Sequence, residues 1–254
     1  MITPQITTSG LIGLILLILM IVSMAVFAFR GRKKMASLFR PIPAFQKLGH
    51  AIGLSVEAGT RLHLTLGRGS LSGIEGASAV VGLNILERVA RTASISDRPP
   101  IATSGDATIG ILSQDVLYNS FRSIGASGTY DPIYGQVSGL TPFAYAAGTL
   151  PTIFDEQVST TILTGHFGSE VALIADGSDR VGAMTLAGSD NLPAQAILYA
   201  AAQEPLIGEE LYAAGAYLKT GPVHSASLRA QDLLRWVIIL AIMLGSILKF
   251  LDIL

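Results

Sequence analysis

The chain has 254 residues, of which 50% are hydrophobic and only 14% are charged, and its formal net charge is −1. A charged fraction this far below the usual ~25% indicates that part of the surface is hidden from water. The absence of cysteine excludes disulfide bonds, thiolate metal ligands and cysteine nucleophiles.

The charges are distributed unevenly along the chain. No Asp or Glu precedes Glu57, whereas the same segment carries the basic residues Arg30, Arg32, Lys33, Lys34, Arg40 and Lys47. These residues directly follow an apolar run, which is typical of a basic collar at a membrane surface. We therefore expect no nucleic-acid partner, although basic clusters also bind phosphate backbones.

The first element is an apolar run over residues 11–29, which follows a short uncharged tail at residues 1–10. As a helix it spans roughly 28 Å, close to the ~30 Å hydrocarbon core of a bilayer. The basic linker at residues 30–42 predicts that the tail lies outside and the rest of the chain in the cytoplasm. The alternative, a cleaved signal peptide, carries its basic residues before the apolar run.

Residues 43–224 predict a cytoplasmic α/β domain, because short apolar strands alternate with helices of ten or more residues. The expected strands are 62–66, 101–103, 136–138, 159–164 and 183–187. The expected helices are 44–58, 70–91, 107–124, 141–153, 170–175, 192–202 and 208–218. This order predicts a Rossmann-like, mainly parallel sheet of about five strands with helices on both faces.

The final segment, residues 225–254, predicts a helix that enters the membrane. Its uninterrupted apolar part runs from Trp236 to Leu248, and Lys249 and Asp252 can extend toward the opposite headgroups. Trp236 stands beside Arg235, where an aromatic anchor is expected. The alternative is an amphipathic helix that lies in the interface or packs inside an oligomer.

Three loops after expected strands are rich in Gly, Ser and Thr, and Rossmann-like folds bind ligands at such loops. Glycines permit close backbone approach and helix N-termini bind anions, so a nucleotide or another anionic small molecule is the expected ligand class. The first of these loops, residues 67–73, has the glycine spacing G-x-G-x-x-x-G, which matches neither the dinucleotide fingerprint nor the Walker motif. Tight turns also use glycine for steric reasons alone. The candidate ligand-binding residues are Gly67, Arg68, Gly69, Ser70, Ser104, Asp106, Gly165, His166 and Glu170.

Catalytic and metal-binding signatures are weak. His166 and Glu170 are four residues apart, but a single such pair is more typical of helix capping than of a metal site. His63 alternates within a strand, which predicts a packed or edge histidine. No G-x-S-x-G elbow accompanies the serines. The sequence therefore predicts no catalytic residue and no metal site, and it leaves any cofactor unknown.

Several segments resemble an uncharacterised family of bacterial membrane proteins that carry a domain of unknown function and a transmembrane helix at each end. The resemblance covers most of the chain, including both anchors, and implies a bacterial origin and the same two-anchor layout. For such a chain we expect a location in the inner (cytoplasmic) membrane. It supplies no activity, cofactor or catalytic residue. The segments are RPIPAF (40–45), LGRGSLSG (66–73), SDRPPIATSGD (96–106), TPFAYAAG (141–148), IGEELYAAGAYL (207–218) and SLRAQDLLRW (227–236).

Two functional hypotheses follow. The first is a membrane-anchored structural or scaffolding protein that self-associates through its α/β domain; its expected partners are the lipid bilayer and further copies of the chain, with other membrane proteins as an alternative. The charge-poor domain, the two anchors and the missing catalytic signature favour it. The second is a membrane-tethered binding or enzymatic domain for a nucleotide or another anionic small molecule.

Overall fold

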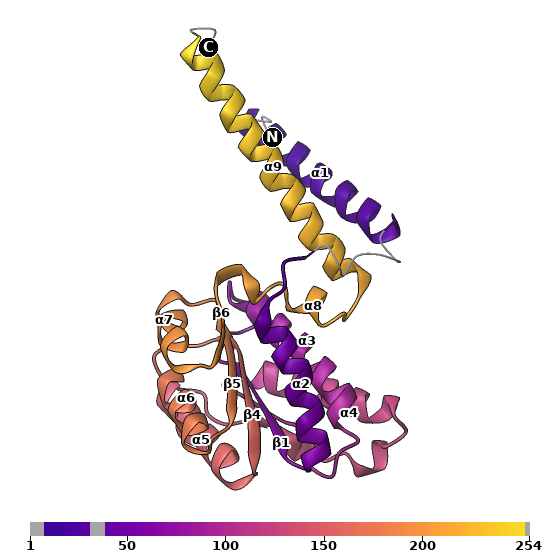
Figure 1. Ribbon diagram of the computed structural model, residues 1–254, viewed down its shortest axis with the longest axis vertical. Helices are drawn as coiled ribbons and strands as arrows, with labels where there is room; N and C mark the ends of the chain where they lie inside the picture. The colour runs from indigo at the N-terminus through magenta and orange to yellow at the C-terminus, as the bar shows by residue number, and fades with distance from the viewer. Residues whose placement is uncertain (1–7, 31–38, 252–254) are drawn as a thin grey trace, which may run out of the picture. The chain divides into compact units, whose positions relative to one another are not determined.

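The computed structural model describes residues 8–30 and 39–251. The chain forms two compact units: an α/β unit from Arg40 to Leu218, and a second unit that contains the two terminal helices (Figure 1). Part of the basic collar, Arg32, Lys33 and Lys34, lies outside the described residues.

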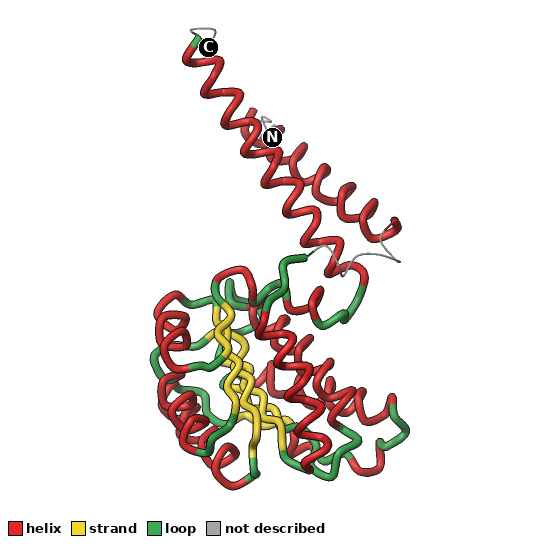
Figure 2. Tube along the Cα trace, viewed as in Figure 1, coloured by secondary structure: helices red, strands yellow, loops and turns green. Residues whose placement is uncertain are grey.

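The α/β unit is built on one parallel sheet of six strands, shown in yellow in Figure 2. The strand order is β3-β2-β1-β4-β5-β6, which is the strand order of the Rossmann fold. The expected α/β class is thus confirmed, with one strand more than the pattern predicted. The strands are β1 (Arg61–Gly67), β2 (Ile101–Ser104), β3 (Gly135–Val137), β4 (Val158–His166), β5 (Met184–Ser189) and β6 (Glu204–Leu206).

Helices cover both faces of this sheet (Figure 1). One layer contains α2 (Pro43–Ala58), α3 (Gly76–Ala93) and α4 (Ala107–Ser123), and the other contains α5 (Pro142–Asp155), α6 (Val171–Arg180) and α7 (Leu192–Ala201). The second layer buries an apolar cluster against β4 and β5, which includes Tyr145, Leu163, Phe167, Ile174 and Leu198.

Local sequence signals explain where most helices begin. Proline stands in the first turn of α2, α5 and α7, where its missing N–H breaks no helical hydrogen bond. Asp106 caps α4 by accepting a hydrogen bond from the Ile109 N–H at 3.0 Å. Gly59, with φ of 65°, ends α2 in the left-handed conformation that favours glycine.

Two expected helices begin late or are split, and the helix expected over residues 170–175 continues to Arg180 in α6. The helix expected over residues 70–91 begins only at Gly76, because residues 68–75 form turns at the end of β1. The helix expected over residues 208–218 is split into a 3₁₀ turn (Gly208–Glu210) and the short α8 (Ala214–Tyr217). Gly208 itself has φ of 59°, a conformation outside the right-handed helix.

The second unit contains α1 (Thr8–Arg30) and α9 (Pro222–Phe250), which contact each other and run antiparallel (Figure 1). Helix α9 begins three residues before the expected start at Ser225. Both helices are long and apolar enough, by length and composition, to cross a membrane. At 23 and 29 residues they extend roughly 34 and 43 Å.

Candidate functional site

The predicted loops meet at the carboxyl ends of the parallel strands. Strand order reverses between β1 and β4, which lie side by side with Gly67 opposite His166. The Gly105 N–H, just after β2, donates to the Gly67 carbonyl at 2.8 Å. The carboxyl ends of β1 and β4 therefore form the topological switch point, where open α/β sheets bind their ligands.

The loops after β1 and β4 approach each other so closely that side chains would not fit between their backbones. A Cβ atom on Gly67, which has φ of 71°, would clash with the His166 carbonyl. The neighbouring Arg68 N–H donates to that same carbonyl at 2.8 Å. Glycine is therefore needed here for steric reasons, whatever else the loops do.

A buried ion pair joins the same two loops. The Arg68 Nε donates to Glu170 Oε1 at 2.8 Å, and the Glu170 side chain is only 1% exposed. The same carboxylate oxygen accepts the Gly168 N–H at 2.9 Å. Burial by itself raises the pKa of Glu170, but the hydrogen bonds from Arg68, Gly168 and its own N–H outweigh burial and lower this pKa below its usual value.

His166 belongs to a second hydrogen-bonded group. Its Nδ1 lies 2.8 Å from Asp190 Oδ1, at the end of β5, and Asp190 Oδ2 accepts the hydroxyl of Ser78 on α3 at 2.8 Å. His166 and Glu170 thus have different partners, and their i, i+4 spacing does not form a pair. The described residues contain no group of three or more His, Asp or Glu side chains arranged to hold a metal ion.

Sequence reasoning missed Asp190, Ser78 and Asn191 in this cluster. Asn191 donates from Nδ2 to the Phe167 carbonyl at 2.7 Å and so ties the β4 and β5 loops together. The polar run Ser189-Asp190-Asn191 follows a strand, as the three predicted loops do, and this position was the available signal.

The remaining predicted residues have local roles. The Ser104 hydroxyl donates to the Asp106 carbonyl at 3.1 Å, and the Asp106 carboxylate caps α4. The Ser70 hydroxyl lies 3.1 Å from that of Ser72 in the turn after β1. A Cβ atom on Gly69 would lie 2.9 Å from the Cβ of His166, so Gly69 also permits close packing.

Beneath the cluster, polar side chains line the buried centre of the sheet. The Tyr145 hydroxyl contacts the Thr65 hydroxyl and accepts the Gly67 N–H at 3.2 Å. Burial raises the pKa of Tyr145 to about 12, so the phenol is neutral. His63 is a packed histidine, one of the two expected alternatives: it is fully buried, and its Nε2 lies 2.9 Å from the Thr103 hydroxyl.

The charges of the cluster limit what it can bind. Arg68 is the arginine among the predicted site residues, but its Nε already donates to Glu170, and His166 Nδ1 lies 2.8 Å from Asp190 Oδ1. The geometry therefore ties the loops after β1, β4 and β5 together. The bond to Glu170 uses Nε, which leaves the Nη1 and Nη2 donors of the partly exposed guanidinium for an anionic ligand.

A domain of unknown function, DUF6754, matches residues 5–254. The chain belongs to the DUF6754 family. No curated protein and no solved structure matches it.

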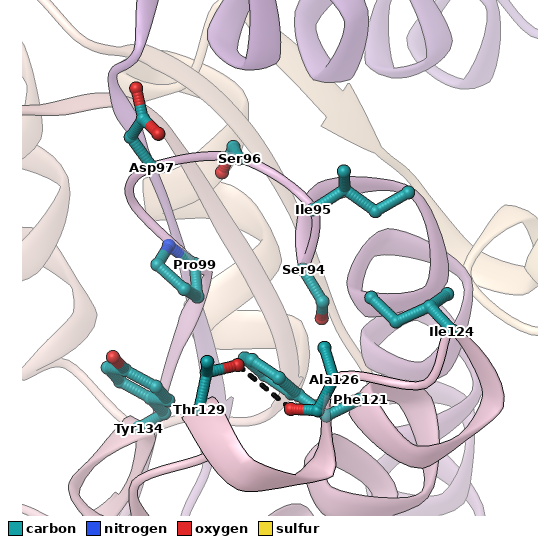
Figure 3. A pocket seen from close by; sticks show the side chains of 10 residues that line it. All are labelled: Ser94, Ile95, Ser96, Asp97, Pro99, Phe121, Ile124, Ala126, Thr129 and Tyr134. Atoms are coloured by element: carbon teal, nitrogen blue, oxygen red, sulfur yellow. Dashed lines mark hydrogen bonds between the residues drawn. The ribbon is translucent and has the colours of Figure 1, made fainter.

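The α/β unit of this DUF6754 chain also has a pocket at the amino-terminal ends of the strands, beside the start of β2 (Figure 3). Its cavity volume is about 460 Å³. No sequence motif indicates it, because its walls come from the last turn of α4 and from the segments that follow α3 and α4. The lining residues are Ser94, Ile95, Ser96, Asp97, Pro99, Phe121, Ile124, Ala126, Thr129 and Tyr134.

Proposed function

We propose that the protein is a membrane-anchored structural protein whose α/β unit self-associates through the outer face of α7. The observation that carries this proposal is the composition of that face. Helix α7 has no charged residue, and the side chains that it exposes are Leu192, Pro193, Ala196, Tyr199, Ala200 and Ala201. Leu192 is 75% exposed and Tyr199 66% exposed.

These residues recur at intervals of three and four, so they form one stripe along the helix. A soluble surface normally carries charge at such positions, and contiguous apolar patches on soluble proteins mark interaction sites. Helix α5, in the same layer, also exposes uncharged residues, among them Phe143, Ala147 and Phe154. The layer formed by α5, α6 and α7 therefore has two apolar stripes.

Assembly through helices agrees with the protection of both sheet edges. At one edge, Pro205 in β6 lacks an N–H, and Glu204 forms an ion pair with Lys47 of α2. At the other edge, the Gln114 side chain donates to the Gly135 carbonyl at 2.7 Å. Such features prevent strands from adding to a sheet, so helix faces are the better contacts between copies.

We expect the substitution Tyr199→Glu to weaken self-association by about 30-fold, because a carboxylate at the centre of an apolar interface loses roughly 2 kcal/mol. Leu54→Glu is the matched control, since Leu54 is 52% exposed on α2 in the other layer. Light scattering of the full chain in mild detergent, over a dilution series, measures the oligomer. A wild-type monomer at every concentration would reject the proposal.

We also propose that α1 and α9 span the inner membrane of a bacterium, with the first residues outside and the α/β unit in the cytoplasm. The antiparallel arrangement places both connections to the α/β unit at the same end of the helix pair. The basic residues that follow α1 and those that precede the apolar part of α9, Arg229 and Arg235, favour the cytoplasm at that end.

The absence of cysteine makes this topology directly measurable. In intact cells, we expect a membrane-impermeant maleimide to label Gln5→Cys, and to label Asn119→Cys, on the exposed side of α4, only after the cells are opened. Alkaline washing should leave the chain in the membrane. Labelling of Asn119→Cys in intact cells would reverse the orientation, and release by alkali would remove the anchors.

Ligand binding is the second candidate function, favoured by the position of Arg68 at the switch point between β1 and β4. A phosphate of a nucleotide, or the anionic group of another small molecule, would bind the Nη groups of the Arg68 guanidinium. A nucleotide that raises the melting temperature of the wild type but not of Arg68→Ala would support this function. Equal shifts in both proteins, or none, would count against it.

A further inference from the structure

The pocket at the amino-terminal ends of the strands lies where two long helices end. Ser94 is the C-cap residue of α3 and Ile124 is the C-cap residue of α4, and both line the pocket (Figure 3). The last carbonyl groups of a helix carry a partial negative charge, which stabilises a nearby cation. Here the carbonyls of Ala93, Phe121 and Arg122 also accept hydrogen bonds from the turns that follow. The arginines in these last turns, Arg91 and Arg122, do not line the pocket.

The side chains add charge of the same sign. Asp97 is the one lining residue with a charged side chain at neutral pH, and no described residue forms an ion pair with it. Tyr130 packs against the ring of Phe121 with 5.6 Å between centroids. Burial first, and then the carboxylates of Asp131 and Asp115, raise the pKa of Tyr130. Carboxylates therefore lie near the pocket wall, in addition to the Arg61 guanidinium beside Tyr134.

The walls are suited to an apolar body. Pro99, Ile95 and Ile124 supply aliphatic surface, and the rings of Phe121 and Tyr134 stack with 5.9 Å between centroids. The Arg61 guanidinium already lies 5.8 Å from the Tyr134 ring centroid, so this ring is in cation–π contact within the chain. Aromatic walls and carbonyl groups are the usual partners of organic ammonium ions.

A polar group also lies unused in the wall. The Ser94 residue is 5% exposed, and its hydroxyl has no hydrogen-bond partner among the described residues. In Figure 3 this hydroxyl points into the space between Pro99 and Ile124. A buried hydroxyl without a partner is unfavourable.

We propose that this pocket binds a small organic cation, an ammonium or guanidinium group on an aromatic or aliphatic body. The cavity of about 460 Å³ lies within the range of ~300–1,000 Å³ that is usual for small-molecule sites. The cation lies near Asp97 and the ends of α3 and α4, and the apolar body lies against Phe121 and Pro99. This site is separate from the Arg68–Glu170 and His166–Asp190 pairs at the carboxyl ends of the strands, and from the exposed apolar face of α7.

Three probes of similar size and different charge test the proposal: 2-phenylethylammonium, 2-phenylethanol and 3-phenylpropionate. Saturation-transfer NMR on the full chain in detergent measures their binding. We expect the ammonium to bind at least about 10-fold more tightly than the alcohol, because two helix ends and one carboxylate each favour a cation. The carboxylate should not bind.

Variants locate the binding. Asp97→Asn should weaken binding of 2-phenylethylammonium by about 5-fold and leave 2-phenylethanol unchanged; Asp179→Asn, on the exposed side of α6, is its control. Ala126→Phe should abolish binding by filling the pocket, whereas Ala107→Phe, at the other end of α4, should not. Equal binding of ammonium and alcohol, or wild-type affinity in Asp97→Asn, would overturn the proposal even if Ala126→Phe failed to fold.

Discussion

Replacing Arg68 with alanine should lower the free energy of unfolding of the α/β unit by about 3 kcal/mol. The change leaves the Glu170 carboxylate buried without its cation, and removal of one partner of a buried pair typically costs about 3–5 kcal/mol. The side chain of Arg68 is 23% exposed, which favours the lower end of that range. The alanine also removes the packing of the arginine stem against Gly105.

The double variant Arg68→Met/Glu170→Gln should recover part of this loss, since it removes both charges and keeps most of the volume. Arg91→Ala is the control, because the exposed Arg91–Glu87 pair on α3 contributes at most about 0.5 kcal/mol. Pulse proteolysis in urea measures these differences on the full chain. A loss in Arg68→Ala no larger than in Arg91→Ala would show that the buried pair does not hold the loops.

This pair also predicts a sensitivity to acid. The pKa of Glu170 in the folded chain lies below its ordinary value of 4.5, so the stabilisation is present above pH 4.5. It is lost as the pH falls from there through the lower pKa of the folded chain. The slope of stability against pH below 4.5 should therefore be smaller in Arg68→Ala than in the wild type.

The second large effect comes from His63. Burial lowers the pKa of His63 from 6.5 to about 3, so the folded chain keeps this imidazole neutral. Between these pH values the unfolded chain binds a proton that the folded chain does not, and the stability decreases as the pH falls. One such group contributes roughly 1.4 kcal/mol per pH unit, or about 2 kcal/mol of lost stability at pH 5.

We expect His63→Gln to remove this slope between pH 6.5 and pH 5, while an amide nitrogen still reaches the Thr103 hydroxyl. The exposed His50 on α2 provides the control, because His50→Gln should leave the slope as in the wild type. Hydrogen exchange of the amides in β1 and β4, followed by mass spectrometry, reports the opening free energy at each pH. The same slope in His63→Gln and the wild type would contradict a neutral buried imidazole.

Much of the fold could be predicted from the sequence because its signals are local. Prolines at helix starts, the Asp106 cap and the alternation of strands and helices depend on neighbours within a few residues. The same signals placed Gly67, Ser104 and Gly165 at strand ends. These residues come together because the carboxyl ends of parallel strands all lie at the same end of the sheet. The apolar helices at both ends were equally readable, because length and composition define them.

Tertiary structure decided everything that depends on distant residues meeting. Arg68 pairs with Glu170 across 102 positions of the chain, and Thr103 reaches His63 across 40. No local pattern encodes such a partner. Strand β6 exists only because β5 offers it a neighbour, since a three-residue segment that contains proline has no strand signal of its own.

The sequence by itself thus determined the two apolar helices, the α/β class and the position of the predicted loops at the carboxyl ends of the strands. The tertiary structure determined that those loops are held by a buried ion pair, that the helix expected over residues 208–218 is split, and that a pocket lies between the ends of α3 and α4. The physical reason is the range of the interactions: caps and periodicity act within a turn, whereas ion pairs, close glycine contacts and cavities arise only when the sheet brings distant segments together.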